Sequence, residues 1–539
     1  MVRRNSRSPL QWLGLFCLSL LLLLSCGRST PESNTARPDD RITFGTTATV
    51  STIDPADAYN IFSGLLLYNL GDRLYTYKSG TNELEPQLAI ALPKVSADGL
   101  TYTIPLRQGV VFHDGEPFNS KAMAFSMKRF VENGGSPAFL LADLVKSVEP
   151  ITDYELTINL KKPFAAFPSL LAFSGACAVS PKAYEIKKGA FKSEEFVGTG
   201  PYKLVKYGTD SLQLEAFDRY WGPKPKNRGI VVQLFSSPAN LFNAFRSGAV
   251  DIAFQSLALD QVRNLQNAAT DGWQVIEQSG SSINYLTLNL KSPPLDRPEV
   301  RQAIAAVLDR SLLQERVFLG QIEPLYSLIP STLAVQKPVF QEKYEDPSGT
   351  KVKEVLAQAG FSQSNPLKLE FWYRSNLIND QLAAITLKAI VQKRTAGVMQ
   401  LELKGIESTT AYQNLSKGAY PMFLLDWTPD FPDPDNYIQP FLECAKGSDA
   451  TGCEDGSSFL QGSFYYSDRA NQLIDRSRKE QNSDTRKQIF TELQNLLAQD
   501  IPFIPLWQSK DYVFVQKKIQ GTRLEVTQKI PFSDLRKTG

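Results

Sequence analysis

The sequence contains a single histidine, His113, among its 539 residues. Zinc sites of the usual kind use several histidines or cysteines, and a serine or cysteine triad needs a histidine base. This scarcity argues against a metal site and a histidine-dependent hydrolase, and we expect His113 in a turn or at the surface. Charge of one sign is not in excess either, because 58 Lys and Arg balance 56 Asp and Glu. Such a chain has no bulk field to attract nucleic acid, so we expect no nucleic-acid partner.

Apolar runs long enough to cross a membrane are absent as well. The longest run, residues 13–24, has 12 residues, whereas a membrane-spanning helix needs about 20. Three arginines precede this run within the first seven residues, which is typical of a secretory signal peptide. We therefore predict a signal peptide over residues 1–25.

The signal segment ends in Leu23-Leu24-Ser25-Cys26, which resembles a bacterial lipobox. In that motif the cysteine is acylated and becomes the first residue after cleavage. Cys26 is therefore the predicted lipidation site, and we expect an exported protein anchored at the membrane surface, facing the periplasm or the cell exterior. The alternative is an ordinary signal peptide with a chance cysteine. Residues 26–40 lack apolar periodicity and are predicted to be a flexible tether.

Only three cysteines remain in the body of the chain. Cys444 and Cys453 flank a loop of Gly, Ser and Asp that is short and pliable, so we predict a disulfide between them in an oxidising compartment. The alternative is a pair of reduced surface cysteines. Cys177 lies in a small apolar stretch and is predicted to be a buried thiol.

The body of the chain alternates strand and helix patterns, as expected for a mixed α/β protein in several lobes. Alternating apolar residues predict strands near residues 42–47, 101–107, 154–160 and 512–515, and Pro105 places the second of these at a sheet edge. Apolar residues at helical spacing predict four helices: one after Asn119-Ser120, one running from about Pro298 to Leu312, one over 352–359 that Gly360 ends, and one after Ser483-Asp484.

Residues 98–130, DGLTYTIPLRQGVVFHDGEPFNSKAMAFSMKRF, resemble the signature region of extracellular solute-binding proteins of the peptide/nickel class, family 5. These proteins serve ATP-driven (ABC) importers. Further blocks resemble the same family in the same order: GTGPYKLV and DRYWGPKPK (198–226), FRSGAVDIAF (245–254), NYLTLNLKSPPLDRPEVRQAIAAVLDR (284–310) and LLDWTPDFPDPDNY (424–437). The resemblance spans nearly all of the chain after the signal segment.

The resemblance implies a bilobed periplasmic-binding-protein fold of α/β class, with two mixed lobes joined by a hinge and an extra inserted domain. We expect lobe I to combine residues 41–81, 197–277 and 506–539. Inserted domain II is then expected over 82–196 and lobe II over 278–505. Crossovers between the lobes would act as hinges, and a bound ligand would contact both lobes only in the closed form.

The acidic stretch 426–435 is the main candidate for ligand binding. It lies among the aromatic residues Trp427, Phe431 and Tyr437, and three prolines exclude a helix. In peptide-binding relatives, an aspartate at the position resembling Asp430 takes the α-ammonium group of the peptide. The alternative is that these acids only cap turns, and Pro429 departs from the small, unbranched residue that many relatives carry before the aspartate.

A second candidate lies in Phe371-Trp372-Tyr373-Arg374, after a strand-like segment. Arg374 could pair bidentately with a ligand carboxylate, or it could be a surface arginine. Trp372, like Trp427, could wall a side-chain pocket or pack in the core. Tyr68 lies in a segment that resembles the part of lobe I bordering the cleft, and it is a further candidate for the lining.

These features favour a receptor without catalytic residues or cofactor. We expect a monomer that captures short peptides and delivers them to the permease subunits of an ABC transporter. Within this class, relatives also take nickel chelates, haem, opines or oligosaccharides. A secreted hydrolase using the acids of 426–435 is the alternative from another class, since paired carboxylates can perform glycoside chemistry. A surface lipoprotein with a degenerate cleft is a third alternative.

Overall fold

One mixed sheet of 11 strands runs through the computed structural model, which describes residues 40–254, 257–269, 272–346 and 348–538. One end of the sheet lies within the residues expected to form lobe I, where parallel β1 and β10 lead to antiparallel β9 and β8. The other end belongs to lobe II, where β14 lies between parallel β15 and β16. The order along the sheet is β15 (Met399–Ile406), β14 (Leu367–Arg374), β16 (Met422–Trp427), β12 (Trp273–Leu288), β19 (Phe503–Gln516), β11 (Ile252–Phe254), β1 (Ile42–Thr46), β10 (Gly229–Leu234), β9 (Ser211–Ala216) and β8 (Tyr202–Tyr207), with β13 (Ile322–Pro324) paired to β19.

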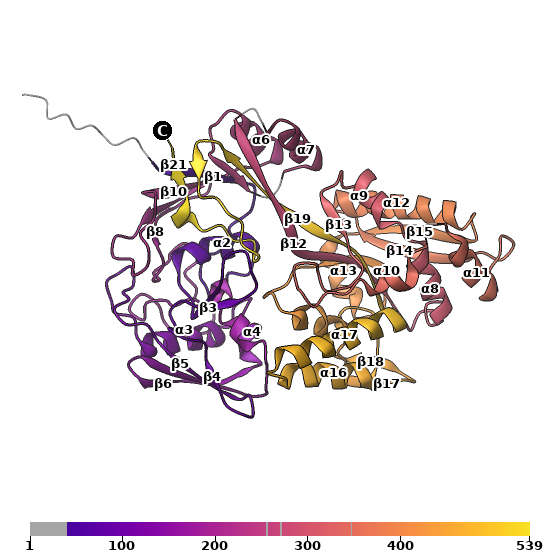
Figure 1. The fold of residues 1–539 in the computed structure, drawn as a ribbon, viewed down its shortest axis with the longest axis horizontal. Helices are drawn as coiled ribbons and strands as arrows, with labels where there is room; N and C mark the ends of the chain where they lie inside the picture. The colour runs from indigo at the N-terminus through magenta and orange to yellow at the C-terminus, as the bar shows by residue number, and fades with distance from the viewer. Residues whose placement is uncertain (1–39, 255–256, 270–271, 347, 539) are drawn as a thin grey trace, which may run out of the picture. The chain divides into compact units, whose positions relative to one another are not determined.

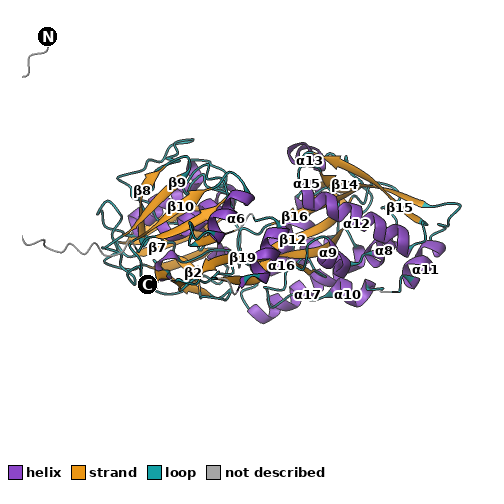
Figure 2. Cartoon of the chain, turned by 90° about the horizontal axis from the view of Figure 1, so that it is seen from above, coloured by secondary structure: helices purple, strands orange, loops and turns teal. Residues whose placement is uncertain are grey.

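Two long strands, β12 and β19, belong to both lobes and pass from one to the other (Figures 1 and 2). Their register shifts between Ser279 and Ile283, where β12 carries extra residues opposite β19. Gly280 lies in this bulge, and a Cβ atom there would overlap Ser509 of β19, so only glycine fits. The boundaries expected at 277/278 and 505/506 fall inside these two strands.

Helices cover the sheet of lobe II and complete its apolar core. The helix predicted from Pro298 to Leu312 is two helices, because Leu308 is extended and the side chain of Asp309 accepts a hydrogen bond from the backbone N–H of Leu312 at 3.0 Å. An aspartate that caps a new helix thus ends the continuous one that the apolar stripe suggested. The helices of this lobe are α8 (Pro298–Val307), α9 (Arg310–Arg316), α10 (Val339–Tyr344), α11 (Thr350–Gln358), α12 (Ile378–Arg394), α13 (Ser408–Leu415), α14 (Gln439–Leu442), α15 (Ser457–Leu460), α16 (Asp468–Lys479) and α17 (Ser483–Asp500).

The residues expected to form domain II, 82–196, contain a separate sheet ordered β4-β5-β7-β6. The predicted helix begins as expected, with Asn119 capping it through a 3.0 Å hydrogen bond from Ala122 N–H. The edge position predicted for the strand containing Pro105 is wrong, because β5 lies between β4 and β7. Pro105 is tolerated as the last residue of β5, where its carbonyl accepts from Ile90 and no N–H is needed. The elements are β4 (Lys94–Val95), β5 (Thr101–Pro105), α3 (Ser120–Glu132), α4 (Phe139–Ala142), β6 (Val145–Thr152), β7 (Glu155–Leu160) and α5 (Phe167–Leu170).

Lobe I adds few helices, and the first of them borders the site described below. This helix, α2, is capped by Asn60, whose side chain accepts a 2.7 Å hydrogen bond from Ser63 N–H. The remaining α-helices and strands of the described chain are α2 (Ile61–Leu70), β2 (Tyr75–Tyr77), β3 (Leu84–Pro86), α6 (Pro238–Arg246), α7 (Leu259–Asn267), β17 (Lys446–Ser448), β18 (Gly452–Asp455), β20 (Ile519–Gln520) and β21 (Arg536–Lys537).

His113 lies in a turn, one of the two places expected from the sequence, but it is not at the surface. Its side chain is buried, its Nε2 lies 3.0 Å from the carbonyl of Gly200, and its Nδ1 accepts from the backbone N–H of Gly198 at 3.3 Å. The two ring nitrogens of His113 therefore hold the backbone of residues 198–200 against the turn that contains the histidine. Desolvation by burial lowers the pKa of His113 to about 4.

We expect His113 to make the folded protein less stable in mild acid. The unfolded chain binds a proton at the imidazole near pH 6.5, whereas the folded chain does so only near pH 4. The free energy of unfolding should therefore fall as the pH drops from about 6.5 to 4, by on the order of 3 kcal/mol. As the only histidine, His113 gives a single imidazole signal in NMR, and its titration midpoint measures the folded-state pKa. A titration midpoint near 6.5 would contradict a buried, neutral imidazole at His113.

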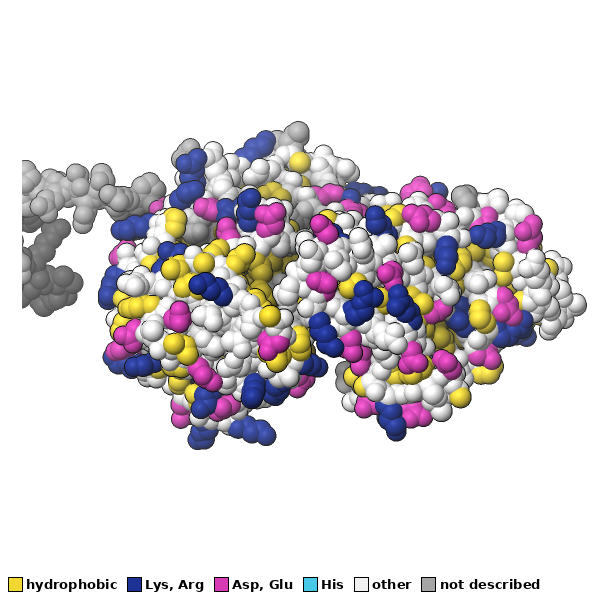
Figure 3. Space-filling view, turned by 60° about the horizontal axis from the view of Figure 1, so that its bottom comes forward, with side chains coloured by type: hydrophobic (Ala, Val, Ile, Leu, Met, Phe, Trp, Pro, Cys, Tyr) yellow, Lys and Arg dark blue, Asp and Glu magenta, His cyan; other side chains and the backbone are white. Residues whose placement is uncertain are grey.

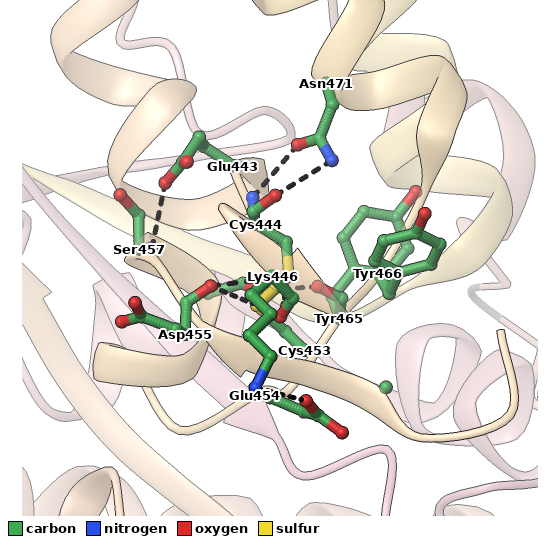
Figure 4. The surroundings of a disulfide bond; sticks show 12 residues. Glu443, Cys444, Lys446, Cys453, Glu454, Asp455, Ser457, Tyr465, Tyr466 and Asn471 are labelled. Carbon is green, nitrogen blue, oxygen red and sulfur yellow. Dashed lines mark hydrogen bonds and ion pairs between the residues drawn. A yellow bond between two sulfur atoms is a disulfide. The ribbon is translucent and has the colours of Figure 1, made fainter. Parts of the chain in front are cut away.

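Cys444 and Cys453 form a disulfide that joins the end of α14 to the β17–β18 hairpin (Figure 4). The backbone of Cys444 is held in turn by Asn471 of α16, which accepts from its N–H at 2.9 Å and donates to its carbonyl at 3.0 Å. Cys177 is a free thiol buried in the same apolar core as α2, and burial raises its pKa to about 12.

Thiol counting tests this arrangement. Protein that begins at Gly27 should incorporate one alkylating group when unfolded without reductant, and three after reduction. The native protein should incorporate none, because the thiol of Cys177 is inaccessible and protonated. Mass spectrometry reads each count directly, and three reactive thiols before reduction would exclude the disulfide.

The predicted signal peptide, Cys26 and most of the predicted tether lie outside the described residues. Within the described residues, no helix combines the length and apolar character that crossing a membrane requires.

Candidate ligand-binding site

A cavity of about 280 Å³ lies where lobe I, domain II and lobe II meet. Lobe II contributes Ser281 and the 428–432 stretch, and domain II contributes residues 169–175. Lobe I contributes the start of α2 and the 525–529 turn near the carboxyl end. In the space-filling view the surface is hollowed between the lobes, with hydrophobic side chains inside the hollow (Figure 3). The cavity is therefore built by segments that lie far apart in the sequence.

The acidic stretch is shaped by its prolines and by two of its own acids. After β16 ends at Trp427, Pro429 and Pro432 keep the chain out of an α-helix, whereas Pro434 begins a short 3-10 helix, a position that a proline tolerates. Asp433 caps the short 3-10 turn Pro434–Tyr437 and pairs with Arg486 at 2.6 Å, while Asp435 forms a bidentate pair with Arg478. Both carboxylates are therefore paired within the fold, and Asp430 is the acid of this stretch that lines the cavity.

Asp430 is half-buried and has no cationic partner among the described residues. The hydroxyl of Tyr59 donates to its Oδ1 at 2.5 Å, and its own N–H donates to the side chain of Asn436 at 3.0 Å. Desolvation by burial raises the pKa of Asp430, and burial together with the nearby carboxylate raises the pKa of Tyr59. Because Tyr59 belongs to lobe I and Asp430 to lobe II, this hydrogen bond joins the two lobes across the cavity.

Lys529 lines the same cavity from lobe I. Its ammonium group makes one long hydrogen bond, 3.3 Å to the carbonyl of Ile61 in α2. No carboxylate of the described residues lies within ion-pair distance of it. Desolvation by burial, with a smaller contribution from Arg73, lowers the pKa of Lys529 to about 8.

Two of the predicted aromatic residues line the cavity. Phe431 is buried and packs edge-on against Phe164 of domain II, with ring centroids 6.1 Å apart. Tyr68 presents one face to the guanidinium of Arg73, which lies 4.6 Å from the ring centroid. Burial raises the pKa of Tyr68, so the phenol stays neutral.

The other predicted aromatic residues pack away from this cavity. Trp427 packs against Phe441, with its indole N–H buried and without a hydrogen-bond partner in the described chain. Trp372 packs on Tyr420 and donates to Glu370 at 3.0 Å. Tyr437 is buried and donates its hydroxyl to the carbonyl of Ser281 at 2.8 Å, which fixes the bulge of β12.

Arg374 is buried, so the alternative of a surface arginine is wrong. Its guanidinium donates to Asp380 at 2.8 Å and also pairs with Asp426, while Tyr412 accepts at 3.0 Å. Burial alone would lower the pKa of Arg374, but the two carboxylates raise it. Arg374 lines a second cavity of about 640 Å³, which adjoins the first because Thr428 lines both.

Tyr59 and Lys529 were not among the sequence-based candidates. A single tyrosine in a loop and a single lysine near the end of the chain carry no motif that points to a ligand. Tyr59 directly precedes residues 60–68, the segment of Tyr68 that resembles the part of lobe I bordering the cleft, and this proximity is the one sequence signal that points to Tyr59. Within the described residues, no group of three or more His, Cys, Asp or Glu side chains is arranged to hold a metal ion.

Comparison with known proteins agrees with this architecture. The family described as "Bacterial extracellular solute-binding proteins, family 5 Middle" matches residues 83–449. Heme-binding protein A of Haemophilus influenzae is 27% identical over 493 residues, covering 86% of this chain and 85% of its own. The dipeptide-binding protein of Escherichia coli is 25% identical over 524 residues, covering 93% and 91% respectively.

Among solved structures, HbpA2 from Haemophilus parasuis superposes with a TM-score of 0.81 at 21% identity, covering 93% of this chain and all of the other. At that identity the likeness establishes the bilobed periplasmic-binding-protein fold. Together with the family match over most of the described chain, it confirms the resemblance seen in the sequence. The chain belongs to family 5 of the bacterial extracellular solute-binding proteins.

Proposed function

We propose that this chain is the substrate-binding lipoprotein of an ABC importer and that it captures short peptides. Asp430 binds the α-ammonium group of the peptide, and Phe431 and Tyr68 form apolar walls of the site. The protein is a receptor without catalytic residues, and it works as a monomer that hands its ligand to membrane permease subunits. Cys26 carries the lipid that holds it at the membrane.

The observation that carries this proposal is the half-buried carboxylate of Asp430, which lines an apolar cavity and lacks a cationic partner in the described chain. A desolvated carboxylate is costly, and an ammonium group that pairs with it removes that cost through charge-assisted hydrogen bonds. Every peptide with a free amino terminus carries such a group, whatever its side chains. Recognition through the terminus therefore suits a receptor that takes many sequences.

Capture requires closure of the two lobes on the ligand. We propose that β12 and β19 bend at the bulge that contains Gly280, between lobe I (41–81, 197–277, 506–539) and lobe II (278–505), with domain II (82–196) moving with lobe I. Asp430 from lobe II and the 525–529 turn from lobe I then contact one ligand together. A ligand that contacts both lobes binds the closed form better and shifts the population toward it.

The cavity that Asp430 lines suits a small ligand. Its volume of about 280 Å³ lies just below the range typical of small-molecule pockets, roughly 300–1,000 Å³, and the adjoining cavity of about 640 Å³ lies beyond Thr428. Haem remains the second candidate, because the relative from Haemophilus influenzae is named for heme binding. A nickel chelate or an oligosaccharide would keep the same hinge mechanism with another recognition chemistry.

A ligand panel tests the proposal. Protein that begins at Gly27 should melt at a higher temperature with a pool of di- and tripeptides, and not with haem, a nickel–histidine chelate or maltotriose. The peptides should be recovered intact after incubation, because a receptor returns its ligand unchanged. A stabilising effect of haem alone, or cleavage of the peptides, would contradict the proposal.

A further inference from the structure

We propose that Lys529 binds the carboxyl-terminal carboxylate of the peptide, so that the cavity recognises both charged ends of a short peptide. This inference rests on the proposed function and adds a second recognition group to the same site. It replaces Arg374 in the role that the sequence suggested for that arginine.

The local fold directs Lys529 into the cavity. Residues 525–529 form a tight turn, in which Gln528 N–H donates to the carbonyl of Glu525, and Glu525 N–H donates to the carbonyl of Lys529, both at 2.8 Å. The turn brings the lysine against helix α2 at Gly64. A Cβ atom on Gly64 would lie 2.9 Å from the ammonium nitrogen, so the glycine leaves the space that this group occupies.

The nearby acid of the turn is not available to neutralise Lys529. Both oxygens of Glu525 are occupied: Oε1 accepts from Arg523 at 2.7 Å and from Ser79 at 3.1 Å, and Oε2 accepts from the backbone N–H of Gly80 at 3.1 Å. A lysine ammonium has three donors, and here the described chain uses one of them, weakly. Two donors remain for a ligand.

The local charge favours an anion at Lys529. The positive charge of Arg73 also lowers the pKa of Lys529, so this part of the cavity carries a second cation's influence. With a pKa of about 8, Lys529 is still mostly cationic at pH 7. A carboxylate in this partly desolvated cavity would gain more from the lysine than it would in water.

Arg374 offers the opposite environment, although arginine is the better carboxylate ligand in general. It is flanked by Asp380 and Asp426, so one positive charge faces two negative ones. An added ligand carboxylate would raise the number of acids around one cation to three. The geometry therefore points to Lys529 as the anion site and to Arg374 as a structural cation.

The two sites together define the ligand class. The cavity lining presents a carboxylate without a cation, Asp430, and an ammonium group without a carboxylate, Lys529, together with the aromatic side chains of Phe431 and Tyr68. A zwitterionic peptide of two or three residues matches this charge pattern. Recognition of both termini limits length, whereas recognition of the amino terminus alone does not.

Two peptide pools test the inference. A mixed pool of di- and tripeptides is prepared with free carboxyl termini and, separately, with carboxyl-terminal amides. Each pool is incubated with the protein, and bound members are released and identified by mass spectrometry. We expect the wild-type protein to retain members of the acid pool at least tenfold better than their amides.

Variants assign that preference to one side chain. Lys529→Gln should bind acids and amides about equally, and Lys529→Arg should keep the preference. Lys121→Gln, which removes an exposed lysine of α3, is the matched control and should behave as the wild type does. A tenfold preference that survives in Lys529→Gln would overturn the inference.

The remaining outcomes distinguish a failure of the role of Lys529 from a failure of the proposed peptide function. If the wild type retains both pools equally, the peptide function stands and the role of Lys529 is overturned. If it retains amides that contain Asp or Glu, the anion belongs to a side chain, and the assignment to the terminus is overturned. If it retains neither pool, the peptide function itself fails, and the inference fails with it.

Discussion

Replacing Asp430 with alanine should weaken the binding of peptides by more than tenfold. In the described chain the carboxylate of Asp430 lines the cavity and forms no ion pair, so it is free to bind the ammonium group of a peptide. A hydrogen bond to a charged group contributes roughly 1.5–3 kcal/mol. The empty protein should keep its melting temperature, because removing a desolvated charge offsets the loss of the hydrogen bond from Tyr59. Titration calorimetry with a peptide from the retained pool measures the affinity.

The matched control for this variant is Asp143→Ala, which removes an exposed acid of domain II. It should leave the affinity unchanged. An unchanged affinity in Asp430→Ala would remove Asp430 from the site, and a large drop in its melting temperature would mean that the carboxylate is structural.

The largest effect on stability is expected for Arg129→Met. Arg129 of α3 and Asp54 of the segment after β1 form a bidentate ion pair at 2.6 and 2.7 Å, with side chains only 2% and 0% exposed. The pair joins domain II to lobe I. Removing the arginine leaves a fully buried carboxylate without its cation, which typically costs about 3–5 kcal/mol of unfolding free energy. Urea unfolding followed by fluorescence measures the change.

The neighbouring residue supplies the control. Lys128 lies on the same helix and forms an exposed pair with Glu132 at 3.8 Å. Because solvent screens such a pair, Lys128→Met should change the unfolding free energy by no more than about 0.5 kcal/mol. Equal effects of the two substitutions would show that the buried pair does not hold the domains together.

The fold could be predicted well from the sequence because its signals are local. Alternating apolar residues specified β7, and Asn119 specified the start of α3. The errors arose where a side chain redirects the backbone or a distant segment buries a residue. Asp309 splits one apolar stripe into two helices, and His113 is covered by the Gly198–Gly200 crossing, 85 residues away.

The candidate site could be predicted only in part, for a related reason. Asp430 was recognisable because it lies in a block of family-like residues. Trp427 and Phe431 lie in the same block and each follows an aspartate, yet Trp427 packs against Phe441 whereas Phe431 lines the cavity. Tyr59 lies 371 residues from Asp430, so their contact exists only once the lobes are assembled.

The most direct test of the account is native mass spectrometry of the purified protein beginning at Gly27, followed by denaturation to release what it carries from the cell. The account predicts a spread of co-purified peptides of two or three residues, each with free amino and carboxyl termini, that disappears in Asp430→Ala. Release of haem, a metal chelate or a sugar from the wild-type protein would leave the hinge and the family intact and would contradict peptide binding at Asp430.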